Sequence, residues 1–164
     1  MKVREAMTER FVDQDLGHLI GKAHHAIYKD FDAQVRAAGL STAEWRVLAA
    51  LHDAQPLTLG QLAREVRAQQ PTATKLVQRM AEQGWVVLMA DAQDQRRTRV
   101  AATAAGRRLV KPLIEEARQH EARILSTLGA GETQVLRQLL QKLATNAALA
   151  PSPQRPSPFA WKRR

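Results

Sequence analysis

Apolar residues recur every three or four positions in a long segment near the start of the chain and in two segments near its end. Over residues 13–38 the apolar positions are Leu16, Leu19, Ile20, Ala23, Ile27, Phe31 and Val35, and Gly39 follows them. This spacing predicts one long amphipathic helix that ends at a glycine. The same spacing predicts a helix from Thr103 to about Thr127 and a last helix carrying Val135, Leu136, Leu139, Leu140 and Leu143.

Three shorter helices are expected between these long ones. Ser41 with Glu44, and Thr58 with Gln61, each have the spacing of a capping box, in which two side chains satisfy free backbone donors at a helix start. Pro71 suits the first turn of a third helix, because its missing N–H has no partner there to lose. The apolar stripe of that third helix consists of Ala73, Leu76, Val77 and Met80, and Gly84 ends it.

The pattern changes after Gly84. Trp85–Ala90 is a short apolar run, Arg97–Ala102 alternates, and a charged turn lies between them. These features predict two strands that form a β-hairpin. The sequence therefore predicts a mainly α fold with a small β-hairpin wing, in which a winged helix-turn-helix is flanked by N- and C-terminal helices.

Positive charge is concentrated in the same region. Residues 58–108 carry nine Lys and Arg against four Asp and Glu, whereas residues 1–57 carry seven against eight and residues 109–149 five against four. The last fifteen residues add four cations and no acid. A localised basic excess is typical of a surface that binds the phosphates of a nucleic acid.

Composition excludes several classes of protein. A chain of 164 residues is long enough for one sizeable core, and with no cysteine it has neither disulfides nor thiolate chemistry. It contains no apolar run near eighteen residues and no signal-peptide pattern at MKVREAMTERF. We therefore expect a cytoplasmic protein with no membrane partner.

The residues that could read DNA lie on the third short helix and on the wing. Thr72, Thr74, Lys75, Gln78 and Arg79 occupy the helix faces left over by the apolar stripe. Hydroxyls, amides and cations of this kind contact base edges and phosphates, although an ordinary solvated helix face has the same composition. In the wing, Arg96 and Arg97 suit a minor groove, and Asp94 is placed to hold Arg96 in position.

Four stretches in order resemble the MarR family of bacterial transcription regulators. They are LSTAEWRVLAAL, LTLGQLAREV, QQPTATKLVQRMAEQGWV and DAQDQRRTRVAAT, followed by Ala105 and Gly106. The resemblance covers Leu40 to Gly106, and one departure is Ala102, where the family usually has leucine. It divides the chain into an N-terminal dimerisation helix (1–39), the DNA-binding domain (40–106), C-terminal dimerisation helices (107–149) and a basic, proline-rich tail (150–164).

The resemblance implies a homodimer that binds a pseudo-palindromic operator in double-stranded DNA, and a repressor rather than an enzyme. The helix from Pro71 would enter the major groove and the wing the flanking minor groove. Carried over by position, the contact residues are Gln70, Pro71, Thr72, Thr74, Lys75, Gln78, Asp94, Arg96 and Arg97.

Members of this family commonly respond to small aromatic, often phenolic or carboxylic, ligands. His18, His25, Trp45 and Arg46 could supply imidazole donors, an aromatic wall and a cation for an aromatic acid. The alternative is that Trp45 is an ordinary core residue, Arg46 a surface cation and the histidines solvated.

Two other classes of function compete with this interpretation. Histidines and acids between His18 and Asp32, including His24, His25 and Asp30, could form the metal site of an enzyme. The chain has no HExxH, Gly-rich phosphate loop or nucleophile elbow, so we expect no catalytic residue, no bound metal and no cofactor. A non-specific architectural DNA-binding protein would also suit the basic tail.

Overall fold

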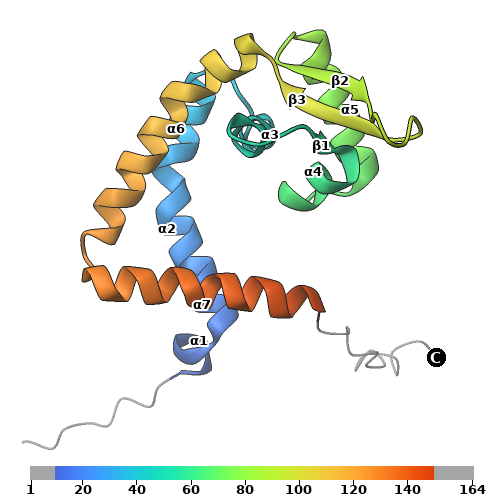
Figure 1. Ribbon diagram of the computed structural model, residues 1–164. Helices are drawn as coiled ribbons and strands as arrows, with labels where there is room; N and C mark the ends of the chain where they lie inside the picture. Colours follow the sequence, from blue (N-terminus) through green and yellow to red (C-terminus); the bar gives the residue numbers. More distant parts are fainter. Residues whose placement is uncertain (1–9, 150–164) are drawn as a thin grey trace, which may run out of the picture. The chain divides into compact units, whose positions relative to one another are not determined.

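The computed structural model describes residues 10–149, which divide after Ile124 into two compact units. The first unit holds almost all of the secondary structure, and the second consists mainly of the last helix, α7 (Ala130–Leu149). The predicted tail at 150–164 lies outside the described residues. The first unit carries both the winged helix-turn-helix (residues 40–106), called the head below, and a long helix on either side of it in the sequence (Figure 1).

The first long helix is interrupted near its start, so the prediction of a single helix over residues 13–38 was wrong there. A short helix, α1 (Phe11–Gln14), precedes α2 (Leu16–Ala37). The break falls at Asp15, whose side chain accepts a hydrogen bond from the backbone N–H of His18 at 2.8 Å. This carboxylate caps α2 and thereby begins a new helix. Gly39, with φ +77°, follows the end of α2, as expected.

The helix-turn-helix consists of α3 (Thr42–His52), α4 (Leu59–Glu65) and α5 (Gln70–Glu82). Both predicted capping boxes are confirmed, because in each box the N-cap side chain accepts from the backbone three residues on and the reciprocal bond is present. The turn between α4 and α5 contains Arg67 at φ +54°, the one non-glycine residue with positive φ in the described chain.

The wing is part of a three-stranded antiparallel sheet with the order β1-β3-β2. The hairpin strands are β2 (Val86–Ala90) and β3 (Thr98–Ala102), paired so that Leu88 faces Val100. The strand β1 (Leu57–Thr58), which leads into α4, pairs with β3 on its other side. Sequence patterning missed β1 because two residues are too few to show an alternation.

One apolar core joins the helix-turn-helix to the long helices on either side of it. Phe31 and Val35 of α2 and Val110 and Leu113 of α6 (Ala104–Leu125) belong to the same buried cluster as Leu48, Leu62 and Val77 of the head. The core therefore crosses the boundaries that the resemblance places after residues 39 and 106. The apolar stripe predicted for α5 is confirmed, since Ala73, Leu76, Val77 and Met80 are all buried.

The apolar faces of the terminal helices stay largely uncovered within the chain. Only Phe31 and Val35 of the α2 stripe are buried, while Leu16, Leu19 and Ile20 are exposed. On α7 the exposed apolar residues are Val135, Leu136, Leu139, Leu140 and Leu143. Each unit thus presents apolar surface that its own described residues leave exposed.

A close contact joins the hairpin to α6. The hydroxyl of Thr103 donates to the carbonyls of Gly84 at 2.7 Å and Trp85 at 3.2 Å, and accepts from the N–H of Gly106 at 3.1 Å. A Cβ at position 106 would lie 2.1 Å from the Trp85 carbonyl oxygen. Glycine is required there because the obstacle is backbone and cannot rotate away.

We expect Gly106→Ala to lower the free energy of unfolding by about 1–3 kcal/mol, as overpacking of a well-packed site does. Gly21→Ala is the control, because α2 leaves open space around that position and alanine favours a helix by about 1 kcal/mol over glycine. Urea unfolding of both variants measures the difference. Equal stability of the two variants would contradict the close contact.

Candidate nucleic-acid interface and ligand pocket

The helix α5 turns one face into the core and leaves its polar residues toward solvent. Gln70, Pro71, Thr72, Lys75 and Gln78 are exposed, whereas Thr74 is half-buried. The hydroxyl of Thr74 donates to the carbonyl of Gln70 at 2.9 Å. Thr74 therefore has its proton engaged with its own helix, while the other predicted contact residues face outward.

Arg79, one turn after Lys75, is tied to another helix. Its guanidinium lies 3.2 Å from the carboxylate of Glu44, which is only 7% exposed at the start of α3. Burial opposes ionisation of Glu44, but hydrogen bonds from Ser41 and the charge of Arg79 outweigh it and lower its pKa. The ion pair fixes the outer face of α5 to α3.

An ion pair that sequence patterning did not indicate joins the two strands of the wing at the loop end of the hairpin. The carboxylate of Asp91, 4% exposed at the end of β2, lies 2.5 Å from Nε of Arg99 in β3. Arg99 also donates to the carbonyl of Pro56 at 3.1 Å, just before β1. Since Asp91 and Arg99 are eight residues apart across a hairpin, a cross-strand pairing of opposite charges was the available signal.

Asp91 also closes the turn that follows it. Its carboxylate accepts from the backbone N–H groups of Gln93 at 2.8 Å and Asp94 at 3.3 Å. The hydrogen bond from Gln93 and the one from Arg99 lower the pKa of Asp91, against burial, which raises it. The ionised form of Asp91 is therefore the one that holds the wing together.

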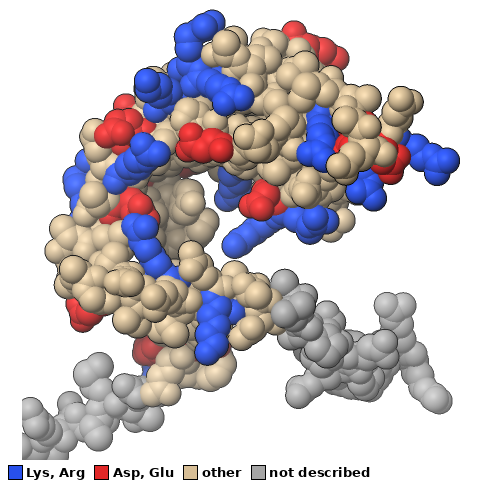
Figure 2. All heavy atoms as spheres, in the orientation of Figure 1, with Lys and Arg blue, Asp and Glu red and all other residues tan. Residues whose placement is uncertain are grey.

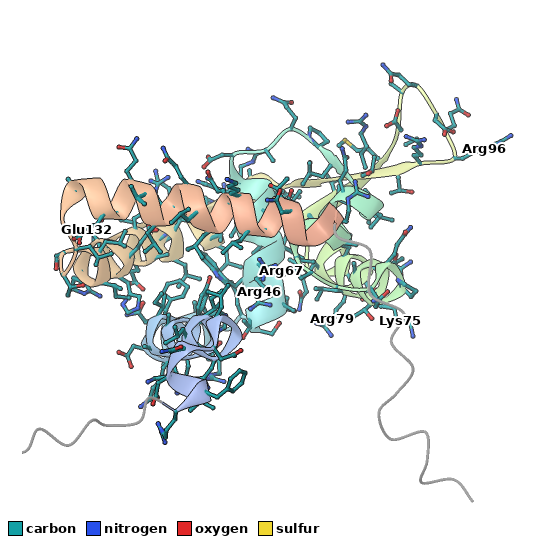
Figure 3. All side chains as sticks on the ribbon, turned by 90° about the horizontal axis from the view of Figure 1, so that it is seen from below. Arg46, Arg67, Lys75, Arg79, Arg96 and Glu132 are labelled. Carbon is teal, nitrogen blue, oxygen red and sulfur yellow. The ribbon has the colours of Figure 1, made fainter. Side chains whose placement is uncertain are left out.

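The wing tip is organised by Asp94. Its carboxylate accepts from the backbone N–H of Arg96 at 3.1 Å and lies 3.2 Å from the guanidinium of Arg97. Asp94 thus holds the backbone of Arg96 and the side chain of Arg97. The side chain of Arg96 extends outward from the end of the wing (Figure 3).

A polar groove of about 500 Å³ lies between the wing and the start of α4 and α5. It brings Gln70 of α5 together with Arg96 and Arg97 of the wing, which are candidates from distant parts of the sequence. Arg64 of α4 and Arg99 line it too, and neither was predicted as a contact residue. In Figure 2, cations lie on the wing as well as over other parts of this face, with acidic side chains among them. Four arginines around one groove suit the phosphates of a DNA backbone.

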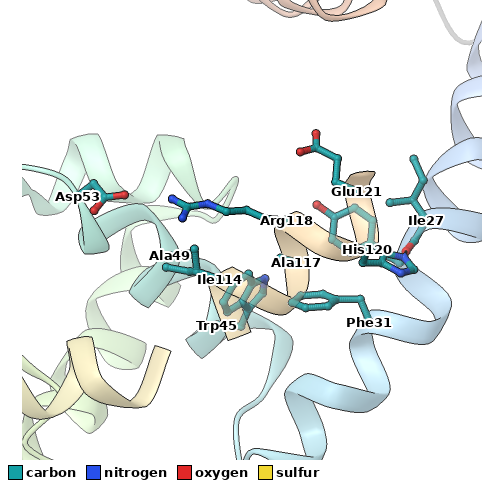
Figure 4. A pocket seen from close by; sticks show the side chains of 11 residues that line it. Ile27, Phe31, Trp45, Ala49, Asp53, Ile114, Ala117, Arg118, His120 and Glu121 are labelled. Carbon is teal, nitrogen blue, oxygen red and sulfur yellow. The ribbon is translucent and has the colours of Figure 1, made fainter. Parts of the chain in front are cut away.

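A second, mainly apolar pocket of about 370 Å³ lies between α2, α3 and α6 (Figure 4). Phe31 and Trp45 form part of its wall and meet edge to face, with ring centroids 5.1 Å apart. His120 of α6 stands beside them and its Nε2 lies 2.6 Å from the carbonyl oxygen of Ile27, so Nε2 carries the proton in this contact. Arg118 is the single cation among the eleven residues that line the pocket.

The residues predicted for a ligand are placed differently from one another. Trp45 lines the pocket, whereas His18, His25 and Arg46 are exposed and are not among its lining residues. The cation and the imidazole that line the pocket belong to Arg118 and His120 of α6. The signal for them was their position on α6, one turn from the apolar residues Ile114 and Ala117.

Among residues 10–149 no three His, Asp or Glu side chains are grouped so that they could hold a metal ion, and this includes His24, Asp30 and Asp32. Within the same residues, none of the helices has the length and hydropathy needed to cross a membrane.

The lowered pKa of Asp91 gives stability a defined pH dependence. A lowered folded pKa contributes stability that is complete above the ordinary Asp value of about 3.9 and is lost as the pH falls through the folded value. We expect Asp91→Asn to have a lower free energy of unfolding than the wild type at neutral pH. The difference between the two should shrink below about pH 4. Urea unfolding at a series of pH values, with Asp30→Asn as an exposed control, measures it. A difference that stays constant down to the most acidic point would contradict the role of the ionised carboxylate.

Comparisons with known proteins agree with this geometry. The sequence profile of the MarR family matches residues 38–97. The HTH-type transcriptional repressor NicR of Pseudomonas putida is 30% identical over 132 residues, which are 80% of this chain and 84% of NicR. A MarR family transcriptional regulator from Silicibacter pomeroyi DSS-3 is 36% identical in its crystal structure, with a TM-score of 0.72 over 82% of this chain and 99% of that one.

A second solved structure is NadR in complex with 4-hydroxyphenylacetate, 25% identical with a TM-score of 0.75, covering 84% of this chain and 98% of NadR. The match extends beyond the head, since the similar segment includes most of the first unit in each case. The winged helix-turn-helix, its basic groove and these relatives lead to one conclusion: the chain belongs to the MarR family of DNA-binding transcription regulators.

Proposed function

We propose that this protein is a repressor that binds a pseudo-palindromic operator as a homodimer and is released by a small aromatic carboxylate. The observation that carries the proposal is the presence, in one unit, of an arginine-lined groove at the wing and an aromatic pocket behind the helix-turn-helix. The similarity to NicR, a repressor, supports the direction of regulation.

The head has the parts needed to read DNA at two places. The exposed residues of α5 suit the major groove, with Gln70, Thr72 and Gln78 available for base edges. Arg96 at the end of the wing suits the adjacent minor groove, where the negative potential is enhanced. The groove between α5 and the wing then lies over the backbone that separates the two.

The exposed apolar faces support a homodimer. Leu16, Leu19 and Ile20 on α2 and five residues on α7 are left uncovered in the chain. Apolar patches of this kind mark protein–protein interfaces, and a symmetric pair of heads demands half-sites separated by about one helical turn of DNA.

The pocket suits an aromatic acid. Phe31 and Trp45 provide a face for a ring, Arg118 a cation for a carboxylate, and Asp53 and Glu121 acceptors for a hydroxyl group. The volume of about 370 Å³ is in the usual range for a small-molecule site. The similarity to NadR, whose structure contains 4-hydroxyphenylacetate, supports the same class of ligand.

For the DNA half of the proposal, we expect Arg96→Ala to weaken binding to a duplex selected from random sequence by the wild-type protein about tenfold or more, by loss of a minor-groove contact of about 1–3 kcal/mol. Arg108→Ala, which removes one exposed cation from α6, is the charge-matched control. Fluorescence anisotropy at fixed salt measures both variants. Competition with unselected duplex tests the architectural alternative, because a regulator retains a preference of roughly a thousandfold.

For the ligand half, we expect 4-hydroxyphenylacetate to lower the affinity of the wild type for that duplex, and DNA to lower the affinity for 4-hydroxyphenylacetate by the same factor, because the coupling is one free energy. Arg118→Gln should abolish the effect, while Arg46→Gln, outside the pocket lining, should preserve it. Calorimetry and anisotropy measure the two affinities. An undiminished response in Arg118→Gln would remove this arginine as the carboxylate partner.

A further inference from the structure

The first turn of α3 makes a contact on three different sides. The hydroxyl of Thr42 donates to the carboxylate of Asp32 in α2 at 2.6 Å. The carboxylate of Glu44 accepts from Arg79 in α5 at 3.2 Å. The ring of Trp45 lines the aromatic pocket. One turn of helix is thereby joined to α2, to α5 and to the pocket. The helix α5 carries the candidate major-groove contacts and is called the recognition helix below.

Glu44 is held rigidly within this turn. Its Oε2 accepts from the N–H of Ser41 at 2.8 Å and from the hydroxyl of Ser41 at 2.7 Å, and its Oε1 accepts from Arg79. Both oxygens of a nearly buried carboxylate are thus engaged. Because these bonds hold the Glu44 side chain in one position, a movement of the turn also moves the partner of Arg79.

Trp45 is the neighbour of Glu44 and is equally confined. It is 8% exposed and packs edge to face on Phe31 of α2. A ring that enters the pocket meets Trp45 in its wall, and because the indole is also packed on Phe31, a push on it is transmitted to its backbone. The same backbone carries Glu44, one residue earlier.

We propose that Glu44 is a positioning residue through which occupancy of the pocket changes the placement of the recognition helix. A ring seated against Trp45 displaces the first turn of α3, Glu44 moves with it, and Arg79 no longer holds α5 in the orientation that fits the major groove. This inference rests on the proposed function, because it assigns a route to the response of that pocket.

The proposal makes a prediction opposite in sign to simple electrostatics. A carboxylate beside a DNA-binding helix repels phosphate, so its neutralisation alone would tighten binding. If Glu44 positions α5 through Arg79, the same neutralisation weakens binding. The sign of the change therefore separates a positioning role from a charge effect.

The first experiment compares Glu44→Gln with Glu82→Gln, which removes an exposed carboxylate from α5 itself. We expect Glu44→Gln to bind the selected duplex about tenfold more weakly, in the usual range of coupling between sites, and Glu82→Gln to bind it equally or more tightly. Thermal unfolding checks that both variants are folded. Wild-type or tighter binding by folded Glu44→Gln would overturn the proposal.

The second experiment fills the pocket without any ligand. Ala117→Phe places a ring next to Trp45, and Ala122→Phe adds the same ring at an exposed position of α6 outside the pocket lining. We expect Ala117→Phe to weaken DNA binding about tenfold in the wild-type background and less than about twofold in the Glu44→Gln background, a non-additivity that a merely structural role would not produce. Additive effects, or no effect of Ala117→Phe in the wild type, would overturn the proposal.

Arg79→Gln keeps the test available if Glu44→Gln does not fold. The side chain of Arg79 is 58% exposed, so its replacement removes the ion pair with Glu44 without changing a buried residue. The effect of Ala117→Phe should be lost in this background as well, and its persistence there would overturn the proposal.

Addition of 4-hydroxyphenylacetate separates this proposal from the proposed function. Release of the wild type but not of Glu44→Gln supports both. Equal release of the two variants leaves the ligand assignment in place and overturns the role of Glu44. Non-additivity of Ala117→Phe without any response to 4-hydroxyphenylacetate supports the role of Glu44 and removes that compound as the ligand.

Discussion

The apolar core that α2 and α6 share with the helix-turn-helix is the constraint on which the rest of the first unit depends. Phe31, Val35, Val110 and Leu113 belong to the same buried cluster as the head residues. The head therefore cannot change its orientation without repacking against α2 and α6, and a close-packed core permits few such arrangements. The aromatic pocket lies between α2, α3 and α6, so it borders the contacts that hold the head in place.

Most of the fold followed from local signals in the sequence. The capping pairs Ser41–Glu44 and Thr58–Gln61 marked helix starts because side-chain bonds to free backbone donors act over three residues. The buried stripe of α5 followed from its spacing. The break at Asp15 was missed because an aspartate is compatible with both a cap and a helix interior, and only the observed bond to His18 distinguishes them.

The candidate sites were predictable only in part, because local signals in the sequence do not show which distant residues meet. The candidate DNA-contact residues on α5 and the wing lie within one stretch of sequence, so pattern and resemblance could indicate them. The pocket joins residues from α2, α3 and α6 that are far apart in the chain, such as Phe31, Trp45 and His120. Periodicity shows that such residues share a stripe, but the side on which three helices leave a cavity depends on packing.

The anchoring of Arg99 affects how the wing responds to force. One guanidinium joins the end of β2, through Asp91, to the segment before β1, through Pro56. The strands are therefore tied to the segment before α4 at the loop end of the hairpin, and only the loop around Arg96 extends beyond this anchor. In the proposed complex with DNA, this loop would adjust to the width of the minor groove, while the anchored strands would keep their spacing from α5.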